Sequence, residues 1–238
     1  MYEGTLTIIA RRGVLTPIIA MNRESAVASI VASEMPLDAP LEALKAQSVV
    51  SRSFLAAGPR HHDFDFCDTT HCQFLRSPDD VNDCIRKAVA DTRGLILVWH
   101  GQTIAALNSS RCGGQTRSLA DVGMNPRSGY PYHAVECRWC REHPIPWETQ
   151  LHPTGQVLPP SNESARIAYF RQWGWSALPG SIFTEKRNVS GGTVEGHSIG
   201  HSLGMCQFGA IGLASSGADF RLILEHYYPN SELMQLHR

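Results

Sequence analysis

Residues 38–58, DAPLEALKAQSVVSRSFLAAG, carry the strongest secondary-structure signal in the sequence, and they predict one long helix. Pro40 suits the first helical turn, and Gly58 ends the helix. Lys45 and Arg52 are seven residues apart and therefore share one face of this helix. Such a face can bind carboxylates or polar sugar groups, because arginine forms forked hydrogen bonds. A solvated helix face is the alternative interpretation.

Shorter patterns surround this helix. Residues 4–20 predict two short strands, and residues 95–110 predict a hairpin. Residues 23–33 and 79–92 show helical spacing of apolar side chains, with Cys84 among the predicted core residues of the second helix. Residues 141–195 differ, because proline recurs there and periodicity is weak. They predict a loop-rich insertion or a second lobe.

The composition is that of a soluble globular protein, with 238 residues, 42% hydrophobic and 18% charged. The formal net charge of −1 gives no general attraction for nucleic acid or acidic membranes, so we expect neither as a partner. No apolar run approaches the ~20 residues that a membrane span needs. The start of the chain lacks the pattern of a secretory signal. We therefore expect either a cytoplasmic protein or one whose leader has been removed.

Seven cysteines cannot all pair in disulfides within one chain. The spacings Cys67-x4-Cys72 and Cys137-x2-Cys140 resemble two metal-binding hairpins. Their four thiolates would complete a tetrahedral zinc site with Zn–S distances of about 2.3 Å, and such a closed site is structural. Disulfides are the alternative, favoured in an oxidising compartment. We favour the metal, because paired short spacings suit one ion better than long cross-links.

Glu34 is a candidate general acid, since it ends an apolar helix just before Met35 and Pro36. A carboxyl group among apolar neighbours keeps its proton to higher pH, because burial disfavours the charged form. An exposed glutamate near a helix end is the alternative, and local sequence alone favours it.

Residues 196–210, GHSIGHSLGMCQFGA, place His201 and Gln207 on a tightly turning, glycine-rich backbone. The glutamate of a two-histidine metal helix is missing, so polar contacts with a ligand are the better interpretation. Structural histidines are the alternative. Residues 109–116, SSRCGGQT, lack the spacing of a dinucleotide fingerprint, and we expect no organic cofactor.

Six motifs in order resemble the stage II sporulation protein D family, which includes amidase-enhancer relatives. They are VASEMP, EALKAQSVVSRSF, CDTTHCQ, AVADTRGLIL, NSSRCGGQT and GHSIGHSLGMCQFGAIGLA…ILEHYYP. These motifs run from about residue 31 to residue 229. Within that span, only about 141–190 lacks a family pattern.

The resemblance implies an α+β fold, as one mixed domain over residues 1–238 with short helices and antiparallel strands around a glycan groove. It implies action on bacterial cell-wall glycan as a lytic transglycosylase, with Glu34 as the catalytic acid. The residues expected to line the groove are Lys45, Arg52, Gln73, His201 and Gln207. Because family members mix cysteine and histidine in the CDTTHCQ loop, His71 or His61 can replace one thiolate of the zinc site.

Three functional hypotheses remain open at this point. The first is a lytic transglycosylase that acts on glycan strands, located in the cell envelope if a leader was removed. The second is a non-catalytic glycan-binding module that presents strands to a cell-wall amidase. The third, ranked last, is a cytoplasmic metalloprotein of unrelated role. The first two use the same groove and differ in whether Glu34 is chemically needed.

Overall fold

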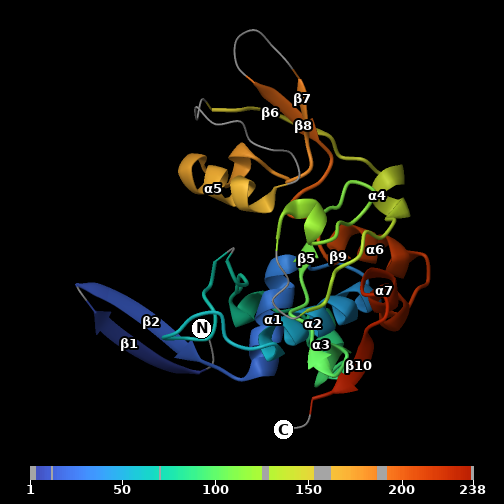
Figure 1. The fold of residues 1–238 in the computed structure, drawn as a ribbon. Coiled ribbons are helices and arrows are strands. Elements are labelled where there is room, and N and C mark those ends of the chain that lie inside the picture. The colour runs from blue at the N-terminus through green and yellow to red at the C-terminus, as the bar shows by residue number, and fades with distance from the viewer. Residues whose placement is uncertain are drawn as a thin grey trace. The chain divides into compact units, whose positions relative to one another are not determined.

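The computed structural model describes residues 4–11, 13–69, 71–124, 129–152, 162–186 and 192–236 (Figure 1). The chain divides into two compact units. The first comprises residues 1–106 with 232–238, and the second comprises residues 107–231. Helices and mostly antiparallel small sheets make up both units, which confirms the predicted α+β class. The predicted extent of one domain, residues 1–238, stays a prediction.

The helices α1, α2 and α3 pack against one another and form the core of the first unit. Their bounds are Arg23–Glu34, Leu41–Ala56 and Asp83–Asp91, and the short 3₁₀ helix η1 (Pro78–Asp80) precedes α3. Asn22 caps α1 and Asn82 caps α3, each accepting a hydrogen bond from a backbone N–H of the first turn. All three helices were predicted from local sequence. Their buried apolar side chains include Val27, Ile30, Val31, Leu44, Val49 and Ile85.

Local signals set the ends of α2, as predicted. The helix begins directly after Pro40 and ends at Ala56, and Gly58 then takes a positive φ of 111°. In α3 the prediction of Cys84 as a core residue was wrong, because its side chain is exposed. The buried face of α3 instead runs through Ile85, Ala88 and Val89.

Two small antiparallel sheets belong to the first unit. Strands β1 (Thr5–Arg11) and β2 (Val14–Ala20) form a hairpin whose side chains are largely exposed. The other sheet has the order β10-β3-β4. Its strands are β3 (Leu95–Trp99), β4 (Gln102–Thr103) and β10 (Glu232–Gln235). The predicted hairpin after residue 95 is confirmed, since β3 and β4 pair across a turn with positive φ at His100 and Gly101.

The second unit brings residues near 108 together with residues near 206. Strands β5 (Asn108–Ser109) and β9 (Met205–Cys206) pair in parallel. Gly204, with φ 64°, allows this approach, because a Cβ there would collide with the carbonyl oxygen of Leu107. The helices of this part are η2 (Ala120–Val122), α4 (Arg138–Glu142), α6 (Gln207–Ser215) and α7 (Phe220–Tyr227).

The segment predicted to be a loop-rich insertion, residues 141–195, holds more regular structure than expected. It contains β6 (Trp147–Gln150), α5 (Glu163–Trp173), η3 (Trp175–Ala177), β7 (Thr184–Lys186) and most of β8 (Thr193–Gly196). The strands form an antiparallel sheet of order β6-β8-β7. Tyr169, Leu178, Phe183 and Val194 form a small buried cluster of their own. The prolines at positions 153, 159 and 160 lie outside the described residues.

Candidate functional site

Glu34 is the last residue of α1, and its side chain is partly buried. The helix ends here because Met35 is extended, with φ −118° and ψ 149°, and Pro36 follows it. Val31, Ala32 and Met35 are buried around this end of the helix. The predicted position of Glu34, at the end of an apolar helix, is therefore confirmed. Its catalytic role stays a prediction.

Lys45 lies on α2 between two carboxylates. Its Nζ is 2.8 Å from Oε1 of Glu42 and 3.2 Å from Oδ2 of Asp91, and 15% of its side chain is exposed. The hydrogen bond to Glu42 is the main cause that raises the pKa of Lys45, and burial opposes it in part. Asp91 also contacts Nζ of Lys87 at 3.0 Å, and these two lysines lower the pKa of Asp91. The Lys45 ammonium thus links α2 to α3.

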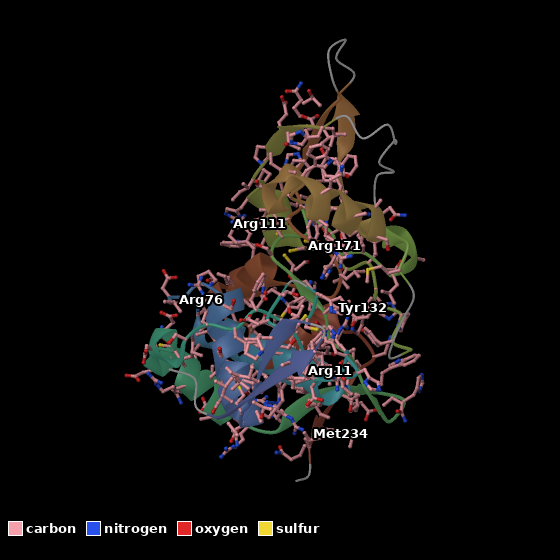
Figure 2. All side chains as sticks on the ribbon, turned by 90° about the vertical axis from the view of Figure 1, so that its left-hand side faces the viewer. Arg11, Arg76, Arg111, Tyr132, Arg171 and Met234 are labelled. Atoms are coloured by element: carbon pink, nitrogen blue, oxygen red, sulfur yellow. The ribbon has the colours of Figure 1, made fainter. Side chains whose placement is uncertain are left out.

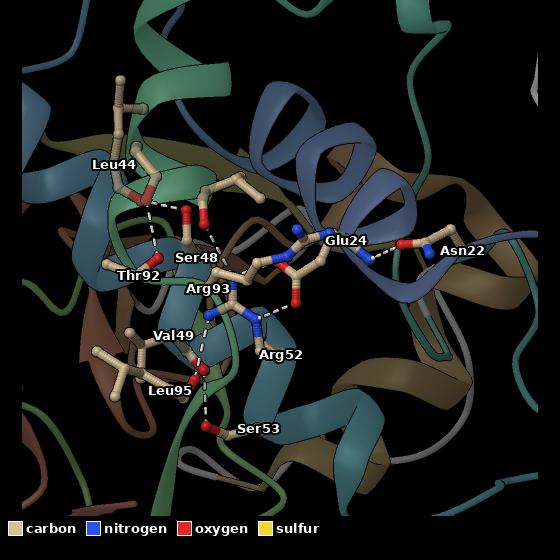
Figure 3. Close-up of polar contacts among 12 residues, drawn as sticks. Asn22, Glu24, Leu44, Ser48, Val49, Arg52, Ser53, Thr92, Arg93 and Leu95 are labelled. Carbon is tan, nitrogen blue, oxygen red and sulfur yellow. Dashed lines mark hydrogen bonds and ion pairs between the residues drawn. The ribbon is translucent and has the colours of Figure 1, made fainter. Parts of the chain in front are cut away.

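Arg52 is completely buried, and its guanidinium is surrounded by acceptors within the first unit (Figure 3). Its Nε and Nη2 donate to the carboxylate of Glu24 at 2.9 and 2.7 Å. Nη1 donates to the carbonyl oxygen of Leu95 at 3.1 Å, and Nη2 also reaches that of Val89 at 3.4 Å. The predicted shared face with Lys45 is correct, but this face contacts α3. We therefore correct the prediction of a glycan contact and assign Arg52 a structural role.

His61, Cys67, His71 and Cys72 form a group of possible metal ligands in the loop after α2. One donor atom from each lies within 4.8 Å of all the others. The Sγ atom of Cys72 is 3.3 Å from Nε2 of His61 and 3.4 Å from Nδ1 of His71. Two thiols and two imidazoles are a donor set typical of tetrahedral zinc.

The loop with this group is attached to both neighbouring helices. The ring of Phe66 packs against Phe54 of α2, with ring centres 5.8 Å apart. Arg76, labelled in Figure 2, donates from its backbone N–H to the carbonyl oxygen of Ser29 at 3.3 Å. The Ser29 hydroxyl donates back to the carbonyl oxygen of Arg76. A metal bound in this loop would therefore stabilise the segment that packs beside α1, the helix that carries Glu34.

Gln73 follows Cys72 directly and is partly buried. Its Oε1 atom is buried and has no hydrogen-bond partner among the described residues. A buried acceptor without a partner costs free energy, which a hydroxyl or amide donor from a ligand would recover.

His201 lies in the second unit, and its hydrogen bonding determines where its proton resides. Nδ1 accepts a hydrogen bond from the backbone N–H of Leu203 at 3.0 Å. Burial lowers the pKa of His201, so the imidazole is neutral at pH 7 and carries its proton on Nε2. That atom can act as a donor to a ligand. Gln207, the first residue of α6, is buried.

Sequence analysis missed two serines in the same unit. The hydroxyl groups of Ser109 and Ser202 are buried and lack partners among the described residues. Ser202 has a φ of 60° and follows His201, while Ser109 lies across from Gly200. The sequence contained one signal for each, since Ser109 and Ser202 both fall in motifs that carried the family resemblance.

The four cysteines predicted to share one zinc site fall into two groups. Cys67 and Cys72 belong to the group with His61 and His71 in the first unit. Cys137 and Cys140 belong to a second group, completed by the two further cysteines Cys112 and Cys206. Spacing along the chain correctly paired each hairpin, but it could not show which distant residues complete each set.

The predicted groove residues are likewise divided. Glu34, Lys45, Arg52 and Gln73 lie in the first unit, and His201 and Gln207 lie in the second. One groove lined by residues of both units therefore stays a prediction. A cavity of about 490 Å³ in the first unit lies between α1 and α3, lined by residues that include Glu24, Arg86 and Arg93. None of the predicted glycan contacts lines it.

Comparison with known proteins shows which family part of this chain resembles. Residues 11–99 match the family model described as Stage II sporulation protein. A Stage II sporulation protein D of Bacillus amyloliquefaciens is 26% identical over 258 residues, covering 89% of this chain and 74% of that protein. The matched segment and this relative support a resemblance of the chain to the stage II sporulation protein D family.

Other proteins similar to this chain carry different names. An uncharacterized protein of Brachyspira hyodysenteriae is 29% identical over 273 residues, covering all of this chain and 73% of that protein. An amidase enhancer of Bacillus subtilis is 23% identical over 286 residues, covering 86% of this chain and 39% of that protein.

The segment that matches the family model runs from the end of β1 to the end of β3. It contains Glu34, Lys45, Arg52 and the group around Cys72, while the second cysteine group lies outside it. Across the described part of the chain, we find no helix that combines the length and apolar character needed to cross a membrane.

Proposed function

We propose that this protein is a lytic transglycosylase that cleaves the bond between N-acetylmuramic acid and N-acetylglucosamine in peptidoglycan, with Glu34 as general acid and base. The observation that carries the proposal is the position of Glu34. It ends α1 among buried apolar residues, inside the segment that matches the family model. A carboxyl group at such a place can donate and accept a proton in general acid–base catalysis.

One carboxyl group is sufficient for this reaction. Protonated Glu34 donates to the glycosidic oxygen, and positive charge develops at the anomeric carbon of N-acetylmuramic acid. The 6-hydroxyl of the same sugar attacks that carbon, and ionised Glu34 accepts the hydroxyl proton. The product is a 1,6-anhydro end. Because the nucleophile belongs to the substrate, the second carboxylate of ordinary glycosidases is not required.

Polar groups in each unit support glycan binding. In the first unit, Oε1 of Gln73 is a buried acceptor without a partner among the described residues. In the second unit, Nε2 of neutral His201 is a donor, with Gln207 six residues further along the chain. Sugar hydroxyls and acetamido groups offer both donors and acceptors to such atoms. We propose that the natural substrate is a strand already stripped of its peptides, located in the cell envelope.

We further propose a structural zinc ion for the group of His61, Cys67, His71 and Cys72. The four donor atoms lie close enough for one ion, and mixed thiolate and imidazole ligands suit zinc. All four positions would be filled by protein, which leaves no place for a reactive water. Its role would be to stabilise the loop that carries Gln73.

Product analysis tests the transglycosylase proposal. The protein is incubated with peptide-free glycan strands, and the products are separated and weighed by mass spectrometry. We expect fragments whose muramic acid ends are lighter by one water than hydrolysis products. Intact strands, or products with ordinary reducing ends, would contradict the proposal.

The alternative function is a non-catalytic module that assists a cell-wall amidase. It is favoured by the relative named amidase enhancer, which this chain matches over 86% of its length. In that case the protein would raise the rate of an added cell-wall amidase, and Glu34→Gln would raise it equally. The glycan strands would keep their length when either the parent protein or Glu34→Gln is added.

A further inference from the structure

We propose that Cys112, Cys137, Cys140 and Cys206 form a second structural zinc site, in the second unit and separate from the group around Cys72. Their four sulfur atoms all lie within 4.8 Å of one another. Around a tetrahedral zinc ion with bonds of about 2.3 Å, neighbouring sulfurs are about 3.8 Å apart. The observed spacing therefore fits four thiolates on one ion.

Three distant parts of the chain supply these ligands. Cys112 follows β5, Cys137 and Cys140 lie at α4, and Cys206 ends β9. The β5–β9 pairing sets Ser109 opposite Cys206, which brings the first and last of these segments together. The backbone N–H of Cys137 donates to the carbonyl oxygen of Gly114 at 2.9 Å, which positions α4. The backbone therefore assembles the group before any ion is considered.

The surroundings of the four sulfurs suit thiolates better than neutral thiols in an apolar core. The backbone N–H of Gly209 donates to Sγ of Cys206 at 3.4 Å, and Oη of Tyr227 lies 3.4 Å from Sγ of Cys137. Such donors to ligand sulfur are typical of metal sites. Cys206 also directly precedes α6, and the N-terminal end of a helix stabilises a negative charge.

Close packing around the group leaves no room for a larger neighbour. A Cβ atom at Gly209 would collide with Sγ of Cys137 and with Oη of Tyr227. Each of the four cysteines is at most 3% exposed. The guanidinium of Arg111, labelled in Figure 2, stacks on the ring of Phe208 at 3.6 Å and attaches the turn before Cys112 to α6.

The geometry distinguishes this site from two alternatives. The sulfur atoms of Cys140 and Cys206 are 3.4 Å apart, far beyond the disulfide bond length of about 2.05 Å. An iron–sulfur cluster distributes its thiolates over two or more iron ions, which holds some of them farther apart than a single ion does. Four mutually close, buried sulfurs match a mononuclear site.

The consequence would be local stability of the segment that carries two predicted glycan contacts. Cys206 directly precedes Gln207 and follows His201 by five residues. A zinc ion at Cys206 would anchor this segment to α4 and to the turn after β5. The proposal concerns metal binding alone and does not depend on the glycan activity.

Metal analysis of the full chain, purified without chelators, tests the site. We expect Cys140→Ser to contain one equivalent of zinc less than the parent protein. Cys84→Ser is the matched control, because Cys84 is exposed and belongs to neither group, and it should retain the parent content. Equal zinc in parent and Cys140→Ser would overturn the proposal, as would iron in place of zinc.

Cobalt(II) binding keeps the test valid if Cys140→Ser does not fold. Metal-depleted parent protein is titrated with cobalt(II), whose absorption distinguishes four thiolate ligands from two. We expect a tetrathiolate spectrum that persists in Cys67→Ser, because that variant alters only the other group. Absence of this spectrum in the parent, with thiols that react only after chemical reduction, would identify disulfides and overturn the proposal.

Discussion

The guanidinium of Arg52 and the carboxylate of Glu24 form a buried, two-pronged ion pair between α2 and α1, with hydrogen bonds of 2.9 and 2.7 Å (Figure 3). Arg52 has no exposed surface, and 19% of the Glu24 side chain is exposed. Since backbone carbonyl groups of Val89 in α3 and Leu95 in β3 accept the remaining hydrogen bonds of Arg52, this side chain links α2 to α1, α3 and β3.

Arg52→Ala should therefore affect stability more than glycan binding. Removing one partner of a buried pair leaves an uncompensated charge and costs about 3 kcal/mol or more. For a chain of this size, that corresponds to a fall in melting temperature of roughly 6–12 °C. Thermal unfolding measures the loss, with Arg86→Ala as control, because Arg86 is exposed on α3. If Arg52→Ala kept the parental stability but lost glycan binding, Arg52 would have to contact the glycan directly.

Glu34→Gln should abolish formation of 1,6-anhydro ends while the protein still folds and binds glycan. Glutamine keeps the shape of the side chain but cannot supply a proton. General acid–base catalysis typically contributes about 10²–10⁴-fold to a reaction rate, so the rate of strand cleavage should fall by at least about 10²-fold. Glu232→Gln, at an exposed position of β10 in the same unit, should retain the parental rate. Cleavage by Glu34→Gln at the parental rate would remove Glu34 from the mechanism.

Asp91→Asn should weaken the link between α2 and α3 in a pH-dependent way. The pKa of Asp91 is lowered by Lys87 and Lys45, so the carboxylate stabilises the folded state above its usual pKa of 3.8. That stabilisation is lost as pH falls through the lowered folded-state value. The effect should be small, because these groups are partly solvated. Urea unfolding of parent and variant should differ at pH 6 and converge in acid; a constant difference would contradict the link.

His201→Gln should remove a pH-dependent part of the stability of the second unit. Burial lowers the pKa of His201 below 6.5, so the unfolded chain binds a proton at a pH where the folded chain does not. Acid therefore destabilises the folded state as pH falls below about 6.5, by at most about 1.4 kcal/mol per pH unit. Unfolding free energies between pH 7 and pH 5 measure this slope. His197→Gln, an exposed neighbour, should keep the parental slope, and an unchanged slope in His201→Gln would refute the assignment.

Local signals in the sequence were sufficient to predict the helices of the first unit. Asn22 and Asn82 cap α1 and α3, and Pro40 and Gly58 bracket α2 as their residue types require. The helix predictions succeeded because a helix forms through contacts between residues three or four positions apart, and its ends depend on one or two neighbours. The position of Glu34 at the end of α1 follows from the same local rules.

Long-range packing settled what the spacing of residues left open. Seven-residue spacing correctly predicted that Lys45 and Arg52 share one face of α2. Only the tertiary structure shows that this face packs against α3. Cys112 and Cys206, 94 positions apart, join one group only because β5 and β9 pair. Burial, ion pairing and the composition of a ligand set depend on which distant segments of the chain come into contact. The free energy that stabilises those contacts comes from the packed core as a whole. A periodic pattern in one segment therefore determines its shape, but its partners follow from the tertiary structure.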